Sequence, residues 1–196
     1  MSKSKVLGLL GVLAWMGVAA ADASAFSASY DQKMTHGREV YQAKVSMKDA
    51  LFRMEMTVEG QESIILRNAQ GTFTVMPSEG MAMKTPMLRP GQGPVQGADN
   101  YAQYLQQRQA ERTGSETIEG RACDIYRYAD PDTGGTTTVW VWTEPMFPVR
   151  FETEAADGKT LTELSNIQLG AAIPDERFQL PAGIQVMDMG ALMRGQ

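Results

Sequence analysis

Residues 39–58 read EVYQAKVSMKDALFRMEMTV, and this stretch decides the fold because apolar and polar side chains alternate along it twice. Each run of alternation places its apolar side chains on one face of a strand: Tyr41, Ala43, Val45 and Met47 in the first run, and Phe52, Met54, Met56 and Val58 in the second. The triplet Lys48-Asp49-Ala50 between the runs is typical of a turn. The stretch therefore predicts a β-hairpin with one buried face.

Short strand-like segments continue along the rest of the chain. Besides the hairpin, the predicted strands are residues 63–67, 72–76, 81–84, 116–119, 122–128, 136–143, 147–154 and 160–169. Turn signals separate them, among them Asp157-Gly158, a dipeptide that suits a tight hairpin turn. Ten or eleven strands with this spacing predict a mainly β (α+β) domain built as an antiparallel meander.

One insertion, at about residues 85–112, interrupts the strands. Residues 85–97 contain three Pro and three Gly, which predict a loop. Asp99 is expected to cap a helix that runs to about Arg112. The apolar side chains at helical spacing on one face of this helix are Tyr101, Tyr104 and Leu105. This stripe is narrow, so we expect the helix to lie over a sheet.

The first twenty-five residues have the features of a secretory signal peptide. Lys3 and Lys5 precede an uncharged, mostly apolar run over residues 6–20, and the small triplet Ala-Ser-Ala closes the segment at Ala25. The run is shorter than the roughly 20 apolar residues of a membrane-spanning helix, which favours cleavage after about Ala25 over a retained anchor. We expect residues 26–196 to be a single periplasmic domain with no stable membrane anchor.

The composition argues against a nucleic-acid partner and against an internal disulfide. The chain has 18 Lys and Arg against 23 Asp and Glu, a formal net charge of -5, and no basic run, so a nucleic-acid partner is not expected. Cys123 is the only cysteine, so the domain is expected to form no internal disulfide. An unpaired thiol within a strand is expected to be buried and inert.

Six segments, taken in order, carry a resemblance to a known superfamily. They are FRMEM (52–56), SIILR (63–67), GSETIEGRAC (114–123), WVW (140–142), PVRF (148–151) and IPDERFQLPAGI (173–184). Together they resemble the LolA-like periplasmic lipoprotein-carrier superfamily, especially its uncharacterised branch of exported domains of unknown function. The resemblance implies a strongly curved antiparallel sheet that forms an incomplete β-barrel, with a helical lid over an apolar cavity for acyl chains. The chain shows fewer helices than the carriers and no match to a carrier functional residue, so lipoprotein transport is not carried over.

Three Met-x-Met pairs stand out in the sequence: Met54 and Met56, Met81 and Met83, and Met187 and Met189. In a strand, residues two apart share a face, so each pair presents two thioethers side by side. Such pairs can fill a core, line a cavity for an apolar ligand, or bind Cu(I). All three interpretations remain open at the level of sequence.

One predicted strand carries two tryptophans, and the sequence does not show whether they face the interior of the protein. Trp140 and Trp142 share one face, and Val139 and Val141 share the other. The sequence leaves open which pair looks inward.

Catalytic motifs are not evident, and the features above favour a binding protein over an enzyme. His36 is the only histidine, and no Gly-x-Ser-x-Gly elbow, phosphate loop or zinc spacing occurs. We therefore assign no catalytic residue, cofactor or metal ligand, and we hypothesise a periplasmic protein that holds an acyl chain, a lipid or a lipidated partner. The expected cavity residues are Tyr41, Val45, Phe52, Met54, Met56, Met81, Met83, Tyr101, Tyr104, Leu105, Trp140 and Trp142. The alternatives are Cu(I) binding through the Met-x-Met pairs and a protein-interaction or sensor domain of the cell envelope.

Overall fold

The computed structural model describes residues 26–58, 60–85, 100–131 and 133–188. Within them, twelve strands form one sheet and one α-helix, α1 (Tyr101–Gln107), precedes the second half of the strands. The strands are β1 (Ser27–His36), β2 (Glu39–Lys48), β3 (Leu51–Val58), β4 (Gln61–Asn68), β5 (Gly71–Met76), β6 (Met81–Thr85), β7 (Glu111–Ile118), β8 (Arg121–Asp130), β9 (Gly135–Trp142), β10 (Phe147–Ala155), β11 (Gly158–Leu169) and β12 (Gln185–Asp188). The expectation of a mainly β protein is confirmed. The expected leader, residues 1–25, and most of the expected loop lie outside the described residues.

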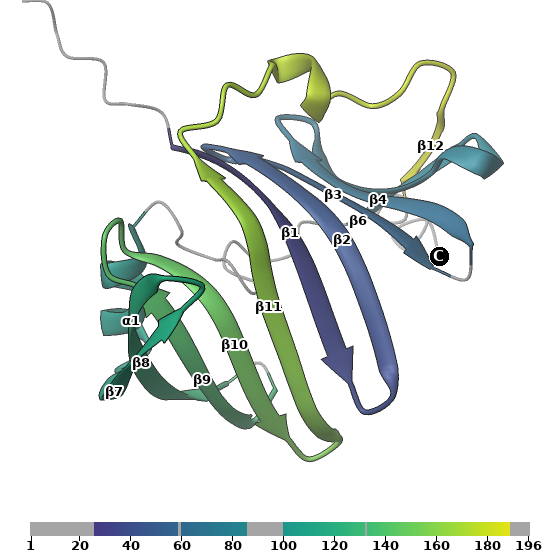
Figure 1. The fold of residues 1–196 in the computed structure, drawn as a ribbon. Coiled ribbons are helices and arrows are strands. Elements are labelled where there is room, and N and C mark those ends of the chain that lie inside the picture. The colour runs from purple at the N-terminus through teal and green to yellow at the C-terminus, as the bar shows by residue number, and fades with distance from the viewer. Residues whose placement is uncertain (1–25, 59, 86–99, 132, 189–196) are drawn as a thin grey trace, which may run out of the picture.

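The sheet joins two antiparallel meanders and is not closed. Its strand order is β12-β6-β5-β4-β3-β2-β1-β11-β10-β9-β8-β7, so β12 and β7 are its two edges. Antiparallel pairing of β1 with β11, from Ala28 opposite Leu169 to His36 opposite Thr160, links the two meanders through the middle of the sheet (Figure 1). Among the strands of the described residues, only β12 and β6 pair in parallel.

The hairpin of residues 39–58 forms as predicted. β2 and β3 pair from Ala43 opposite Met56 to Lys48 opposite Leu51. Asp49 in the turn has φ 51°, a left-handed conformation that Asp tolerates better than most residues. The local alternation therefore specifies both the strands and their register.

Two strands and the extent of the helix differ from the expectations. β1 and β12 were not predicted as strands, because their sequences lack a clean alternation of apolar and polar residues. α1 ends at Gln107 and not near Arg112, because Gln109 has φ 52° and β7 begins at Glu111. The side chain that caps α1 is Asn100, whose oxygen accepts a hydrogen bond from the Gln103 amide at 3.2 Å. Asp99, the expected cap, lies outside the described residues.

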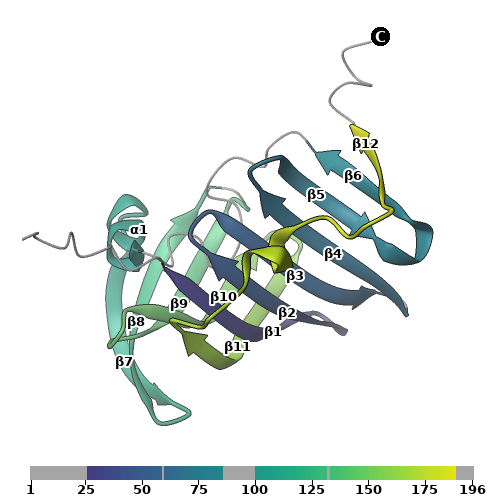
Figure 2. The ribbon, with the colours of Figure 1, turned by 90° about the horizontal axis from the view of Figure 1, so that it is seen from above.

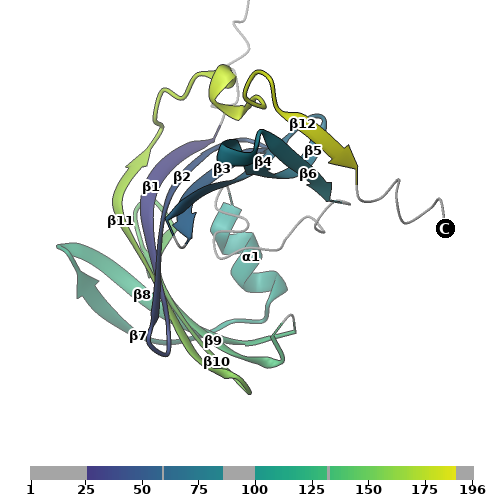
Figure 3. The ribbon, with the colours of Figure 1, turned by 90° about the vertical axis from the view of Figure 1, so that its right-hand side faces the viewer.

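Each face of the sheet carries its own apolar cluster. On the face that we call the inner face, α1 packs on β1, β2 and β8–β11, and in Figure 3 α1 lies on the inner side of the arc that the strands follow. The buried residues of this inner cluster are Ala28, Tyr30, Val45, Met47, Tyr101, Leu105, Tyr128, Val139, Val141, Phe147, Phe151 and Leu164. None of the helices in the described part of the chain is long and apolar enough to cross a membrane.

The opposite, outer face of β3–β6 is covered by residues 170–184, which we call the C-terminal strap (Figure 2). Its side chains pack with those of the strands in the outer cluster: Ile64, Leu66, Phe73, Val75, Ala82, Ile173 and Phe178 are buried, and Leu51, Ala171, Leu180 and Ile184 pack against them. Polar bonds fix the strap at its short 3-10 turn, Asp175–Phe178. The Arg177 guanidinium donates to Ser46 at 3.0 Å and pairs with Glu55 at 2.9 Å.

Candidate functional site

The inner face of β2–β6 is a mainly apolar wall whose side chains the strand register brings together. Val45 lies opposite Met54, Met54 opposite Ile65, Ile65 opposite Thr74, and Thr74 opposite Met83. Because opposed residues share a face, these five side chains form one row across five strands. Beside it, Met56 lies opposite Ala43 and Ser63, and Met76 lies opposite Met81 on the same face.

The two faces of this half of the sheet differ in burial. On the outer face, under the strap, Ile64, Leu66 and Val75 are 2% exposed or less. On the inner face, Met54 packs against the edge of the inner cluster, and the methionines of β3–β6 are all half-buried. The wall thus keeps part of its apolar surface accessible among the residues that the structure describes.

α1 bounds this wall on the side of β1 and β8–β11. Tyr101 and Leu105 are buried in the inner cluster, and the ring of Tyr104 stacks on Tyr101 at a centroid distance of 5.2 Å. The hydroxyl groups of Tyr104 and Tyr128 are 3.3 Å apart. Among the described residues the buried Tyr101 hydroxyl has no hydrogen-bond partner, and desolvation raises the pKa of Tyr101 well above its usual value.

Most of the expected cavity residues lie on this inner face, in two groups. Val45, Tyr101 and Leu105 are buried in the inner cluster, where Phe52, Met54 and Tyr104 pack against them. Met56, Met81 and Met83 belong to the half-buried wall. Tyr41 lies at the far end of β2, where its hydroxyl donates to the Glu39 carboxylate at 2.6 Å. Ile65 and Met76 were missed, although both fall within predicted strands, because their faces are set by the pairing of β3–β6.

Trp140 and Trp142 do not join this group. The structure settles the choice that the sequence left open, because Val139 and Val141 are fully buried in the inner cluster. The tryptophans of the same strand therefore point to the outer face. There Arg121 lies 5.2 Å from the centre of the Trp142 ring, and the Trp140 indole donates to Glu116 at 2.7 Å.

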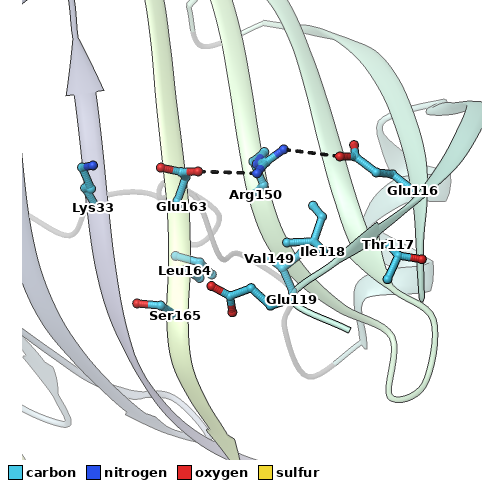
Figure 4. A pocket seen from close by; sticks show the side chains of 10 residues that line it. All are labelled: Lys33, Glu116, Thr117, Ile118, Glu119, Val149, Arg150, Glu163, Leu164 and Ser165. Atoms are coloured by element: carbon cyan, nitrogen blue, oxygen red, sulfur yellow. Dashed lines mark ion pairs between the residues drawn. The ribbon is translucent and has the colours of Figure 1, made fainter. Parts of the chain in front are cut away.

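A polar pocket of about 370 Å³ lies on the outer face, between β10, β11 and the end of β7. Figure 4 shows its central Arg150 between Glu163 and Glu116, with nitrogen–oxygen distances of 3.5 and 4.0 Å. The guanidinium also lies 5.4 Å from the centre of the Trp140 ring. Its charge is thus already compensated by side chains of the protein, and the pocket offers no unpaired cation at its centre.

Cys123 lies beside this region and is 1% exposed. It is opposite Trp142 in the register, and its thiol lies 3.4 Å from the Arg121 carbonyl oxygen. Burial raises the pKa of the thiol, which lowers the fraction of reactive thiolate. The expected burial of this cysteine is confirmed.

Groups of the kind used for hard-metal binding do not converge in the described part of the chain. No three His, Cys, Asp or Glu side chains lie close enough there to hold a metal ion. His36 ends β1, and its Nδ1 is 2.9 Å from the Thr160 hydroxyl.

Comparison with known proteins places the chain in a family and identifies similar folds. Residues 26–146 match the family model "Domain of unknown function (DUF4412)". An uncharacterized conserved protein from Thermus thermophilus has a similar structure, with a TM-score of 0.58 and 13% identity over 85% of this chain and 91% of that chain. MucB, solved in complex with MucA(peri), has a TM-score of 0.52 and 13% identity over 83% of this chain and 57% of its own chain. A second structure of a MucA/MucB complex, from Pseudomonas aeruginosa, also has a TM-score of 0.52. No curated protein matches the sequence.

A LolA superfamily protein from Nitrosomonas europaea is also among the similar structures. Its TM-score is 0.36, at 13% identity over 80% of this chain and 90% of that chain. The family that the chain matches is itself of unknown function, which confirms the expectation of an uncharacterised domain.

Proposed function

The chain belongs to the DUF4412 family, a domain of unknown function, and from its own geometry we propose that it is a non-enzymatic binding protein of the cell envelope. Its ligand is apolar: an acyl chain, a lipid or the lipidated segment of a partner. The ligand lies against the inner face of β3–β6, beside α1. The leader over residues 1–25 exports the chain, and cleavage after about Ala25 releases it into the periplasm.

The observation that carries this proposal is the contrast between the two faces of β3–β6. The outer face has its own cover, the C-terminal strap, whereas the inner wall stays half-buried among the described residues. Removal of apolar surface from water contributes about 25 cal/mol per Å², so a ligand that covers the wall is stabilised by the same effect that holds the strap.

The shape and chemistry of the wall suit a long, flexible ligand. The row from Met54 to Met83 crosses three strand spacings of about 4.8 Å each, or about 14 Å in all, which is long enough for much of an extended acyl chain. Methionine is unbranched and polarisable, so thioether side chains can adapt to a ligand without a fixed shape. In this arrangement α1 acts as the lid of a half-open barrel.

The first experiment asks whether the protein carries a ligand when it leaves the periplasm. Native mass spectrometry of the exported protein, followed by lipid extraction, is expected to show a non-covalent adduct that yields fatty acids or phospholipids. Protein that is free of lipid and takes up no fluorescent fatty acid from solution contradicts the proposal.

A matched pair of variants locates the ligand. Met56 is on the inner face and half-buried, and its neighbour Thr57 is exposed on the outer face. Met56→Lys places a charge in the apolar wall and is expected to weaken binding of a fluorescent fatty acid at least tenfold, because burial of a charge is costly. Thr57→Lys is expected to leave the affinity within twofold. Equal affinities of the two variants would place the ligand elsewhere.

A protein partner is the second candidate. MucB, which shares the fold, was solved in complex with MucA(peri). In this chain Val186 and Met187 on the edge strand β12 are 48% and 42% exposed, a large apolar exposure for two adjacent residues. Stoichiometric co-purification of one envelope protein with lipid-free protein favours this candidate over the lipid.

A further inference from the structure

Four methionines from three adjacent strands meet at the β12 edge of the inner face. Met76 on β5 lies directly opposite Met81 on β6, and Met83 on β6 lies directly opposite Met187 on β12. Met81 and Met83 are two residues apart on one strand and therefore share a face. We call these four residues the methionine cluster.

The sheet geometry brings the sulfur atoms of neighbouring members of the cluster within reach of one another. Directly opposed residues have Cβ atoms about 4.5–5.5 Å apart, and residues two apart along a strand are separated by about 6.6 Å. A methionine sulfur is two bonds from Cβ, and the side chain has three rotatable bonds. Met76 and Met187 lie on opposite sides of β6, so three sulfurs, those of Met81 and Met83 with that of either Met76 or Met187, can converge on one point without movement of the backbone.

The thioether sulfurs of the cluster suit only a small set of metal ions. Thioethers are neutral and soft, and among biological metal ions they favour Cu(I); hard ions such as Mg²⁺ and Ca²⁺ require oxygen ligands. Among the described residues, no group of His, Cys, Asp and Glu offers a competing site for Zn²⁺. Selectivity for a monovalent soft ion thus follows from the ligand type alone.

The cluster is also open to an ion that arrives from solution. Met187 is 42% exposed, and Met76, Met81 and Met83 are half-buried. The side chains of Met76, Met81 and Met83 supply an apolar environment next to the sheet. The exposed side chain of Met187 can rotate so that its sulfur binds the ion from the solvent side.

From these observations we propose that the methionine cluster binds one Cu(I) ion through three thioether sulfurs, those of Met81 and Met83 and that of either Met76 or Met187. This site goes beyond the proposed binding of an apolar ligand, because it needs sulfur atoms and not merely apolar surface. The two activities share Met81 and Met83, so a substitution that removes sulfur but keeps the apolar volume separates them.

The chain provides a matched control in its other Met-x-Met pair on the same face. Met54 lies between Val45 and Ile65 in the register, and Met56 lies between Ala43 and Ser63. Neither has a methionine on a neighbouring strand directly opposite it. The pair on β3 has the same sequence motif as the pair on β6 but lacks the cross-strand sulfurs.

The decisive experiment titrates the exported protein with Ag(I), a redox-stable analogue of Cu(I), and observes the methyl groups of ¹³C-labelled methionine by NMR. One equivalent is expected to shift the ε-methyl signals of Met81 and Met83 and that of either Met76 or Met187, and to leave those of Met54 and Met56 unchanged. Uniform shifts of all methionines, or no shift at one equivalent, overturn the proposal.

Competition with a cuprous chelator then measures the affinity for Cu(I) itself. The double variant Met81→Leu with Met83→Leu is expected to lose at least 100-fold in affinity, and Met54→Leu with Met56→Leu no more than twofold. Met-to-Leu exchange conserves volume and costs less than about 1.5 kcal/mol at a site, so both variants are expected to fold. Of Met76→Leu and Met187→Leu, the one that removes the third sulfur gives an independent loss of about tenfold.

The same variants distinguish this site from the proposed apolar function. Met81→Leu with Met83→Leu is expected to keep its affinity for a fluorescent fatty acid, because leucine preserves the apolar surface. Loss of Cu(I) with retention of fatty acid supports the metal site. Equal Cu(I) affinities of the two double variants contradict it, whatever the outcome for fatty acid.

Discussion

At the scale of single residues, two tyrosines of the inner cluster have hydroxyl groups in opposite situations. Tyr101 is 1% exposed and its hydroxyl finds no hydrogen-bond partner in the described part of the chain, whereas the Tyr128 hydroxyl is 3.3 Å from that of Tyr104. A buried polar group without a partner costs stability, and a bonded one contributes. The same chemical change at the two positions should therefore have opposite effects.

Tyr101→Phe is expected to raise the free energy of unfolding by about 1 kcal/mol, because it removes an unsatisfied buried group. Tyr128→Phe, the matched control, is expected to lower it by about 0.5–1.5 kcal/mol, because it removes the bond to Tyr104. Urea unfolding followed by circular dichroism measures both. A loss of stability in both variants would mean that the Tyr101 hydroxyl has a bonding partner in solution.

At the scale of elements, the C-terminal strap is the part that closes the outer face of β3–β6. Phe178 on the strap is 1% exposed and packs in the outer cluster, and its carbonyl oxygen accepts a hydrogen bond from Asn68 at 2.9 Å. Lys48 and Asp175 form an ion pair at 2.7 Å, which raises the pKa of Lys48 through the hydrogen bond between them. Both groups of this pair are near solvent, so we attribute the docking of the strap to its apolar side chains.

Phe178→Ala is expected to lower the free energy of unfolding by about 3–5 kcal/mol, because it leaves a cavity between the strap and the sheet. The neighbouring Gln179→Ala is the control: the side chain of Gln179 is exposed, and a change within about 0.5 kcal/mol is expected. Urea unfolding measures both variants. Equal stabilities of the two would show that the strap adds nothing to the folded state.

At the scale of the whole molecule, one continuous sheet carries two separate cores, and the inner core contains three buried tyrosines. Burial raises the pKa values of Tyr30, Tyr101 and Tyr128 above the usual value of about 10. The folded state therefore keeps these tyrosines protonated at a pH where the unfolded chain releases the protons. These groups therefore leave the free energy of unfolding unchanged below about pH 10, and they lower it as the pH rises above that value.

The free energy of unfolding is expected to be insensitive to these groups from pH 7 to 9. Above pH 10 it is expected to fall by about 1.4 kcal/mol per pH unit for each tyrosine that stays protonated only in the folded state. Urea unfolding at a series of pH values measures the slope, and Tyr30→Phe, which removes one of the three groups, should reduce it. A slope that is flat to pH 11.5 would contradict the burial of these hydroxyls.

The sequence by itself determined the local elements of the sheet. Alternation over residues 39–58 specified the β2–β3 hairpin, because a period of two and a turn between the runs fix a register without reference to the rest of the chain. The same reasoning located most other strands, the apolar stripe of α1 and the burial of Cys123. It overextended α1, because a left-handed residue, Gln109, ends the helix within an otherwise helical pattern.

Only the tertiary structure decided what depends on pairing between distant segments. β1 joins β11 across more than one hundred residues, and this pairing merges the two meanders into one sheet. The face of Trp140 and Trp142 was fixed by the packing of Val139 and Val141 in the inner cluster. Likewise, Met187 joins Met83 only because β12 returns parallel to β6. Alternation gives each strand two faces, but which face is inner, and which side chains from other strands share it, depends on non-local register that no short stretch of sequence contains.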